Sequence, residues 1–443
     1  SRRRKDQHPP TKEQRLGDWE RRTQESQSKG LRSVFEEVSA RGRSEVVAFE
    51  PEKVIAEAVA DLETSRAVWD RPDLISALNK RLPSCFDDLR ADQVVGLLND
   101  LADQAIGESG LVATLTPPAI VEAPEVLRRK DGRSVYEPHR GENYATIAQL
   151  RREEGILSAA RTTGAPRLHR LSAGQLVAGS RLSPDQARVV SGVLTSGRRV
   201  DVLVGPPGTG KSFTVGTLSG MWTQAVGGKV LGIATSQRAV DVMISEGVAT
   251  GVNVASFLLA HQQMDRGRQS ETFERSRLGS RDLVILDEAS MISTTDFARI
   301  VDIAQRSGAK VLVTGDPEQL GAVGDGGMMS LLVKEFSHYE LGEVRRFATA
   351  WEAEASLQLR AGNAGALYEY ERHGRLRGGN EVEMFEAATT AYLTDFLNGR
   401  QTLLIASTNE EASELSSTIR EELVSLGRLE DGETTALADG NVA

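Results

Sequence analysis

Cysteine and histidine are scarce in this chain, which limits its covalent and metal chemistry. Among 443 residues there are six histidines and a single cysteine, Cys85. One cysteine cannot form an internal disulfide, and no cysteine and histidine cluster with the spacing of a zinc site surrounds it. The sequence therefore excludes a disulfide scaffold and a zinc domain, and it predicts a protein of the reducing cytoplasm.

Long apolar runs and an excess of positive charge are also missing. No stretch approaches the roughly 20 apolar residues that a membrane-spanning helix needs, and the start of the chain lacks the apolar segment of a signal peptide. We therefore expect no membrane contact. The formal net charge is -10, with 53 basic and 63 acidic residues. This balance excludes a protein that holds DNA over a broad basic surface, so any nucleic-acid site must be local.

The length of the chain favours two or more domains. Because the sequence starts with Ser-Arg-Arg-Arg-Lys instead of methionine, we interpret it as a piece of a longer polypeptide. We expect a basic and polar helical linker over residues 1–44 and an accessory domain over residues 45–165. The accessory domain should contain helices, the last of them over residues 143–161, and a hairpin over residues 124–136 that turns at an Asp-Gly pair. A linker at residues 164–166 should follow it.

Apolar strands alternate with amphipathic helices in the expected third domain, residues 166–340. The expected strands are Val200–Val204, Val230–Ala234, Leu283–Leu286 and residues 311–313. Such alternation is typical of a parallel α/β sheet. In residues 341–443 a second α/β unit begins, for which we expect a helix over 381–398, a strand over 402–405 and a helix over 410–426.

A phosphate-binding pattern follows the first of these strands. The sequence G-x-x-x-x-G-K-[ST] is spelled by Gly205, Pro206, Pro207, Gly208, Thr209, Gly210, Lys211 and Ser212. Glycines allow the backbone N–H groups of such a loop to wrap around phosphate oxygens, while the lysine reaches the β- and γ-phosphates and the serine hydroxyl binds Mg²⁺. A chance glycine-rich turn is the alternative, but the strand before and the helical pattern after the loop favour an ATP site.

Polar side chains follow two further strands. Asp287 and Glu288 come directly after Leu283–Leu286, where Asp287 can hold Mg²⁺ and Glu288 can deprotonate the attacking water. Gln319 follows residues 311–313, and its amide can contact both the γ-phosphate and that water. The alternatives are a solvated helix start for the acidic pair and a simple Asp-Pro turn at residues 316–317. Because all three features lie after strands in order, we favour a catalytic site.

The segments at residues 182–186, 287–291 and 315–320 resemble superfamily 1 helicases, and within them the RecD-like group. The segments at residues 344–347, 351–362 and 406–409 are similar to the conjugative relaxase-helicases of the MobF class, TraA and TraI. This resemblance covers the chain from about residue 143 to its end. It implies an α/β fold, in which a RecA-like P-loop NTPase sheet is combined with an N-terminal, mainly helical accessory region and an incomplete second RecA-like domain.

The resemblance also implies roles for individual residues. Gln186 matches the glutamine that reads adenine, and Arg346 matches the arginine that reaches the γ-phosphate, with Arg345 as an open alternative. In the family, certain positions contact single-stranded DNA through the protein backbone. The residues of this chain that match these positions are Thr235, Ser236, Ser256, Phe257 and Asn409. Short polar residues after strands are also common helix caps, so the two interpretations stay open for these positions.

The resemblance implies an ATP-dependent 5′ to 3′ helicase or translocase that acts as a monomer on single-stranded DNA in conjugative plasmid transfer. A relaxase domain would lie upstream in the same polypeptide. The histidines are scattered singly, so we expect no nicking activity here. Because the last motor motifs are missing, we expect weak or no ATP hydrolysis and unwinding. A RecD-like repair helicase and an inactive single-stranded DNA-binding module are the alternatives.

Overall fold

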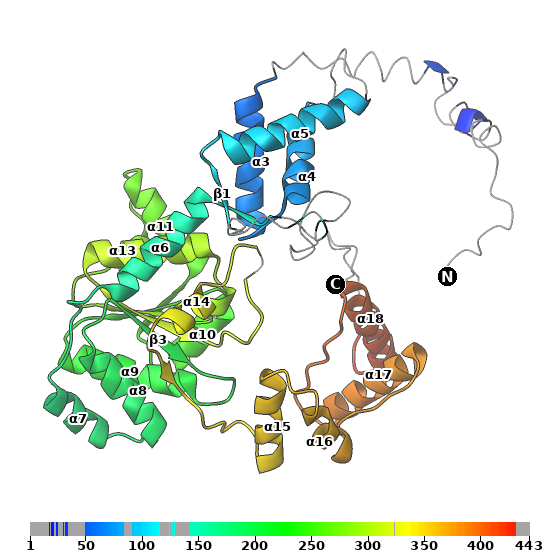
Figure 1. Ribbon diagram of the computed structural model, residues 1–443. Coiled ribbons are helices and arrows are strands. Elements are labelled where there is room, and N and C mark those ends of the chain that lie inside the picture. The colour runs from blue at the N-terminus through cyan, green and yellow to red at the C-terminus, as the bar shows by residue number, and fades with distance from the viewer. Residues whose placement is uncertain are drawn as a thin grey trace. The chain divides into compact units, whose positions relative to one another are not determined.

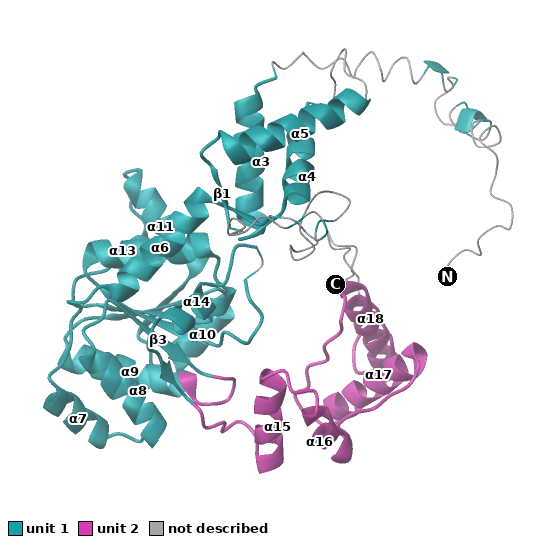
Figure 2. Ribbon diagram, in the orientation of Figure 1, with its two compact units in different colours: residues 1–205, 212–341 teal, residues 206–211, 342–443 magenta. Residues whose placement is uncertain are grey.

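The computed structural model describes residues 49–83, 91–115, 142–322 and 324–430, together with isolated positions between 17 and 33 and at 124, 126 and 128. Most of the expected linker over residues 1–44 and of the expected hairpin over 124–136 therefore lies outside the described residues. The chain divides into two compact units, which are residues 1–205 with 212–341 and residues 206–211 with 342–443 (Figure 2).

A six-stranded sheet forms the centre of the first unit (Figure 1). In chain order its strands are β3 (Val200–Val204), β4 (Val230–Ala234), β5 (Thr250–Asn253), β6 (Leu283–Leu286), β7 (Lys310–Gly315) and β8 (Tyr339–Glu340). Their spatial order is β5-β4-β6-β7-β3-β8, and every pairing is parallel. The four strands expected from the sequence are confirmed, and with them the α/β, RecA-like P-loop fold class.

The four inner strands β4, β6, β7 and β3 are buried on both sides because helices cover both faces of the sheet. In β6, Val284 and Leu286 face one core, whereas Leu283 and Ile285 face the other. The first core is covered by α6 (Ile147–Arg161), α11 (Val254–Asp265), α13 (Thr294–Ser307) and α14 (Met328–Glu335). The second is covered by α7 (Arg170–Ala178), α8 (Pro184–Thr195), α9 (Lys211–Ala225) and α10 (Gln237–Ser245). None of the helices in the described ranges combines the length and apolarity of a bilayer-spanning segment.

The accessory region has a small core of its own. It consists of α3 (Pro51–Ser65), α4 (Arg71–Arg81), α5 (Ala91–Gly107) and the antiparallel pair β1 (Val112–Thr114) and β2 (Tyr144–Thr146). The helix expected from residue 143 begins only at Ile147, because the three residues before it pair with β1. Thr146 caps this helix, since its hydroxyl accepts the Gln149 N–H at 3.0 Å.

Helix α6 joins the accessory region to the sheet. At its start, Arg152 forms an ion pair with Glu63 of α3, and the Thr146 hydroxyl donates to the same carboxylate at 3.1 Å. Further along, α6 packs on α13. The expected linker at residues 164–166 is bound rather than free, because the Ala165 N–H donates to the Gly197 carbonyl at 3.0 Å and Ala165 is buried.

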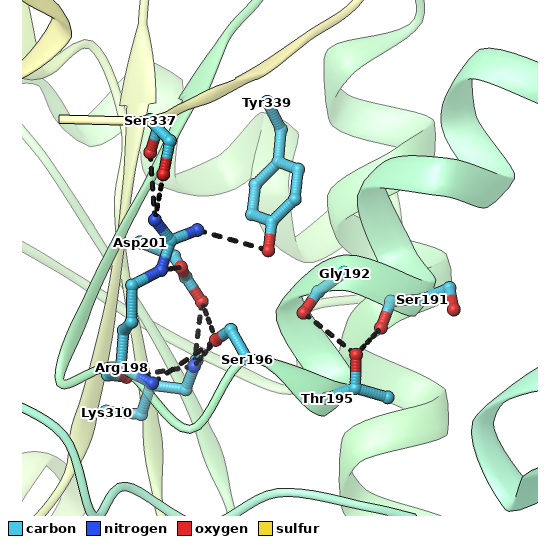
Figure 3. Close-up of polar contacts among 9 residues, drawn as sticks. All are labelled: Ser191, Gly192, Thr195, Ser196, Arg198, Asp201, Lys310, Ser337 and Tyr339. Atoms are coloured by element: carbon cyan, nitrogen blue, oxygen red, sulfur yellow. Dashed lines mark hydrogen bonds and ion pairs between the residues drawn. The ribbon is translucent and has the colours of Figure 1, made fainter. Parts of the chain in front are cut away.

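A buried polar network fixes the amino ends of β3 and β7 (Figure 3). Lys310 and Asp201 have fully buried side chains, and the Lys310 Nζ lies 2.7 Å from the Asp201 carboxylate. Lys310 also donates to the Ser196 hydroxyl, just beyond α8, at 2.7 Å. Arg198 pairs with Asp201 at 2.8 Å and donates to the Tyr339 hydroxyl at 3.2 Å. The network therefore ties α8, β3, β7 and β8 together at the edge opposite to the strands' carboxyl ends.

The second unit is helical in the part that the structure describes. Its helices are α15 (Ala350–Arg360), α16 (Ala366–Arg372), α17 (Glu381–Leu397) and α18 (Asn409–Ser425), of which the last two confirm the expected helices. The strand expected over residues 402–405 is wrong. This segment has no regular secondary structure and no partner strand among the described residues, and Leu403 and Ile405 are 82% and 80% exposed.

Candidate nucleotide site

The phosphate-binding loop connects β3 to α9, so strand, loop and helix follow in the expected order. At its start, the Gly205 N–H donates to the Gly315 carbonyl at 2.9 Å, which places the exit of β3 beside the end of β7. Gly208 and Gly210 have φ values of +83° and +78°, in the left-handed region that favours glycine. The Thr209 hydroxyl turns back onto the Pro206 carbonyl at 2.8 Å, which stabilises the turn of the loop from within.

The two arginines considered for the γ-phosphate both lie at this loop. The Arg345 N–H donates to the Gly208 carbonyl at 2.7 Å, and a Cβ added to Gly208 would lie 2.4 Å from the Arg346 Cβ. The Arg345 guanidinium pairs with Glu343 at 2.6 Å. The backbone thus brings both residues to the loop, and Arg346 as the γ-phosphate ligand stays a prediction.

Asp287 lies directly after β6, and its side chain is held from β7. Its N–H donates to the Ile233 carbonyl at 2.8 Å, and one carboxylate oxygen accepts a hydrogen bond from the Thr314 hydroxyl. Sequence reasoning missed Thr314. The available signal was a hydroxyl residue at the carboxyl end of an otherwise apolar strand, where ligands of parallel sheets bind.

Glu288 has an unusual backbone and a specific side-chain partner. With φ 52° and ψ 37° it is left-handed, and it is the one non-glycine residue of the described ranges with positive φ. Its Oε2 accepts a hydrogen bond from the Thr235 hydroxyl at 3.1 Å. Thr235 follows β4 and was expected to contact DNA. Its contact with the candidate base was not visible in the sequence.

Gln319 lies in a turn that Asp316 organises. Asp316 is 2% exposed, and its carboxylate accepts the Glu318 N–H at 3.2 Å and the Gln319 side-chain amide at 3.4 Å. Asp316 therefore acts as the turn residue that the Asp-Pro alternative for residues 316–317 describes. Gln319 itself is exposed after the carboxyl end of β7, and its contact with a γ-phosphate stays a prediction.

Gln186 takes part in the cap of α8. Its Oε1 accepts the Ser183 N–H at 3.1 Å, and the residue is 1% exposed. The two residues form a capping box, in which each side chain contacts the backbone of the other. The structure thus gives Gln186 a local role, and adenine reading stays a prediction.

The candidate DNA contacts occupy helix starts. Ser236 caps α10, since its hydroxyl accepts the Ala239 N–H at 3.1 Å, and the Ser256 N–H is bound by the Asn253 side chain at 2.9 Å. Asn409 is the exposed first residue of α18 in the second unit. The Phe257 side chain is fully buried in the core, so only its backbone is left to contact DNA. All of these contacts remain predictions.

Among the described residues, no group of three or more histidine, cysteine, aspartate or glutamate residues has metal-binding geometry. A Mg²⁺ ion held between phosphates and one or two protein oxygens does not need such a group. The hydroxyl of Ser212 and the carboxylate of Asp287 are hard oxygen ligands of the kind that Mg²⁺ prefers.

Comparison with known proteins shows which proteins this chain is similar to. Residues 181–381 match the AAA domain. The chain is 28% identical over 390 residues to the conjugal transfer protein TraA of Agrobacterium fabrum, and the aligned region covers 85% of this chain and 33% of TraA. It is 27% identical over 307 residues to the RecBCD enzyme subunit RecD of Mycobacterium tuberculosis, and this alignment covers 61% of this chain and 48% of RecD.

Among solved structures, the Pif1 helicase from Candida albicans matches with a TM-score of 0.37 and 21% identity, over 51% of this chain and 56% of Pif1. The chain spans about a third of the length of TraA. The P-loop, the acidic pair after β6 and the glutamine after β7 all lie within the matched AAA domain. The chain is similar to the conjugal transfer proteins TraA and TraI and to the RecD subunit of RecBCD.

Proposed function

We propose that this chain binds ATP and Mg²⁺ and is the ATP-hydrolysing segment of a motor that moves along single-stranded DNA in the 5′ to 3′ direction, with weak or no hydrolysis and unwinding by this chain alone. The order of the sheet carries this proposal. Strands β6, β7 and β3 are neighbours, so the acidic pair, Thr314 and the start of the P-loop at Gly205 share one edge of the sheet. Ligands of open α/β sheets bind at this edge.

Each group has a chemical role in the proposed hydrolysis. The loop N–H groups and Lys211 bind the phosphates, and Gln186 contacts the adenine. Ser212 and Asp287 hold Mg²⁺, which supplies positive charge to the phosphate oxygens. Glu288 takes a proton from the attacking water, and Gln319 orients that water. Arg346, with Arg345 as the alternative, stabilises the charge that develops on the γ-phosphate.

The proposed DNA substrate and biological context rest on the relatives. TraA and TraI are named for conjugal transfer, and TraA matches 85% of this chain. We therefore propose that the chain is the helicase segment of a larger cytoplasmic polypeptide that also carries a relaxase domain, and that it acts as a monomer in plasmid transfer. Thr235, Ser236, Ser256, Phe257 and Asn409 are the proposed DNA contacts.

A RecD-like role in DNA repair is the second candidate. It is favoured by the match to RecD, which extends over 61% of the chain. Because the match to TraA extends over 85%, we place conjugal transfer first. Expression of the chain in a conjugation-defective strain would separate the two, since restored plasmid transfer supports the first and restored repair alone supports the second.

The proposed ATPase is tested by the rate of ATP hydrolysis with and without a single-stranded oligonucleotide. Lys211→Ala removes a positive charge from the phosphates and should lower the rate by about 10²–10³-fold. Lys334→Ala, which changes an exposed lysine on α14, is the matched control and should leave the rate unchanged. Equal rates above background in the unsubstituted and Lys211→Ala chains would show that the site is misassigned.

The direction of movement needs a separate assay. When the chain is extended by the missing part of the second motor domain, a duplex with a 5′ single-stranded tail should be unwound in the presence of ATP, whereas a duplex with a 3′ tail should stay intact. Unwinding of the 3′-tailed duplex alone would contradict the proposed direction while leaving the ATPase proposal in place.

A further inference from the structure

The loop between β7 and α14 carries Gln319, the proposed contact of the γ-phosphate. We call residues 316–322 and 324–327 of this stretch the sensor loop. Gln319 is exposed, and Leu320 next to it is 84% exposed. Burial of Gln319 itself therefore does not fix its position, which depends on how the rest of the loop is held.

Asp325 ties the end of the sensor loop to the start of α13. It is 3% exposed, and one of its carboxylate oxygens accepts both the Thr295 N–H at 3.1 Å and the Thr295 hydroxyl at 2.9 Å. The Asp325 carbonyl accepts the Thr294 N–H at 2.7 Å. A carboxylate at the first turn of a helix is also stabilised by the helix dipole. Asp325 thus connects the loop after β7 to the helix that follows Asp287 and Glu288 in the chain.

The accessory region contacts the residue before Asp325. Gly324 has a φ of +103°, and a Cβ added to it would lie 2.5 Å from the Thr64 carbonyl oxygen, in the last turn of α3. The last four carbonyls of a helix have no partner inside the helix, so they are available to neighbouring segments. The loop passes so close to α3 that a side chain at position 324 would displace backbone atoms.

The end of α3 is itself fixed to the motor domain. Glu63, next to Thr64, pairs with Arg152 of α6 and accepts the Thr146 hydroxyl at 3.1 Å. Helix α6 in turn packs on α13. Because the close approach at Gly324 is to a backbone oxygen, a change of rotamer in α3 cannot relieve it. The end of α3 therefore limits where the sensor loop can lie.

We propose that the accessory region braces the sensor loop, so that the stretch around Gly324 and Asp325 holds Gln319 where it contacts the γ-phosphate. Gly324 and Asp325 are positioning residues, since they act through Gln319 and need not touch the nucleotide. The accessory region thereby takes part in reading the nucleotide. This inference rests on the proposed function, because it needs Gln319 to contact the γ-phosphate.

The test compares two nucleotides that differ in the γ-phosphate. The dissociation constant of ADP divided by that of the non-hydrolysable ATP analogue AMP-PNP, both measured by isothermal titration calorimetry with Mg²⁺, gives the preference of the chain for the γ-phosphate. Gln319→Ala should lower this ratio about tenfold, the factor that one hydrogen bond to a charged group supplies. A loss of folded protein weakens both nucleotides equally and cancels in the ratio, so a purely structural defect does not change it.

Gly324→Ala should lower the ratio about fivefold, somewhat less than the loss of the whole hydrogen bond, because the added methyl group pushes the loop away from α3. Gly327→Ala is the matched control. Gly327 has nearly the same φ, +105°, but a Cβ added there meets nothing within 4 Å. This variant therefore has the backbone strain without the contact and should leave the ratio unchanged. An equal fall in both variants would assign the effect to strain alone and overturn the proposal.

Thr295→Val is a milder variant that tests the other anchor of the loop. Valine has nearly the shape of threonine but removes one of the two hydrogen bonds to the Asp325 carboxylate, so the ratio should fall about threefold. Thr294→Val is its control, because the buried Thr294 hydroxyl has no hydrogen-bond partner among the described residues. It should leave the ratio unchanged. Equal ratios in Thr295→Val and Thr294→Val would contradict the role of Asp325.

Double variants show whether the anchors act through Gln319. In the Gln319→Ala background, neither Gly324→Ala nor Thr295→Val should lower the ratio further, because no amide is left to position. A further fall would mean that the loop acts on the nucleotide by another route, and the inference would be wrong. If Gln319→Ala leaves the ratio unchanged, or the unsubstituted chain binds neither nucleotide, the proposed site fails together with the inference. If Gln319→Ala lowers the ratio and the anchor variants do not, only the inference fails.

Discussion

At the scale of single residues, Gly208 shows how closely the P-loop approaches its neighbours. Its φ is +83°, and an added Cβ would lie 2.4 Å from the Arg346 Cβ. Gly208→Ala should therefore strain the loop and weaken the binding of a fluorescent ATP analogue by at least about tenfold, the effect of roughly 1–2 kcal/mol of left-handed strain.

Gly220 is the matched control for this substitution. It lies in α9, just beyond the loop, and an added Cβ would meet nothing within 4 Å. Gly220→Ala should leave nucleotide binding unchanged and raise stability slightly, since alanine favours a helix more than glycine does. If Gly208→Ala binds the analogue as well as Gly220→Ala does, the loop does not hold the phosphates.

At the scale of secondary-structure elements, the pair Lys310 and Asp201 joins two neighbouring strands. Both side chains are fully buried, and burial lowers the pKa of the Lys310 ammonium, which Asp201 opposes. Lys310→Met leaves the Asp201 carboxylate buried without this partner. The free energy of unfolding in urea should fall by about 3–5 kcal/mol, as expected when one partner of a buried pair is removed.

Lys334→Met provides the comparison for this stability measurement, because Lys334 is exposed on α14. Its unfolding free energy should stay within about 0.5 kcal/mol of the unsubstituted chain. A loss below about 1 kcal/mol for Lys310→Met would mean that Arg198 and the surrounding hydroxyl groups compensate for the lysine.

His261 of α11, whose ring contacts Phe273 of α12 (Glu271–Ser276), predicts that the free energy of unfolding depends on pH. Burial lowers the pKa of His261 below its ordinary value of 6.5, and nearby Asp265 only partly opposes this. The unfolded chain then binds a proton near pH 6.5, whereas the folded chain does so only at lower pH. The stabilising contribution of neutral His261 is therefore present above pH 6.5 and is lost as the pH falls through the lower folded value.

His261→Phe isolates this effect. The imidazole ring contacts the rings of Phe257 and Phe273, with centroids 4.4 and 5.0 Å apart, so a phenyl ring can replace it in the cluster. The loss of unfolding free energy between pH 7.5 and 5.5 should be smaller in this variant than in the unsubstituted chain. His338→Gln, a change at an exposed histidine, should leave the loss unaltered. Equal losses in all three proteins would assign the pH dependence to other groups.

The sheet was predictable where its strands are apolar. Strands β3, β4, β6 and β7 are buried on both faces and therefore appear as apolar runs. The edge strand β5 is polar and only half-buried, and β8 has two residues, so neither has such a signal. The expected strand at residues 402–405 has the apolar pattern but lacks a neighbour, because a strand forms only with a partner for its backbone.

The candidate site was predictable where its chemistry is local. The P-loop and the acidic pair are motifs of consecutive residues, so the sequence alone is enough to find them. The contacts of Asp287 with Thr314 and of Glu288 with Thr235 depend on which strands flank β6, and neither spacing nor composition determines that order. These side-chain contacts therefore became visible only with the sheet topology.

At the scale of the whole molecule, the net charge of -10 limits how DNA can be held. If the contacts form a narrow path with few cations, few counterions are released on binding. For single-stranded DNA, the logarithm of the binding constant against the logarithm of salt concentration should have a slope no steeper than about -3, which corresponds to roughly four phosphates. A titration of oligothymidylate from 50 to 300 mM salt measures it, and a slope steeper than about -6 would indicate an extended basic surface.

Because the backbone of Glu288 is left-handed, selection for thermal stability and selection for ATP turnover should favour different residues at position 288. A glycine or an asparagine adopts this conformation at lower cost than a glutamate, so a library of variants sorted for thermal stability alone should drift to those residues at position 288. A library sorted for ATP turnover should return to glutamate. Selection for thermal stability alone would therefore remove the proposed base at position 288 and with it the proposed ATP hydrolysis.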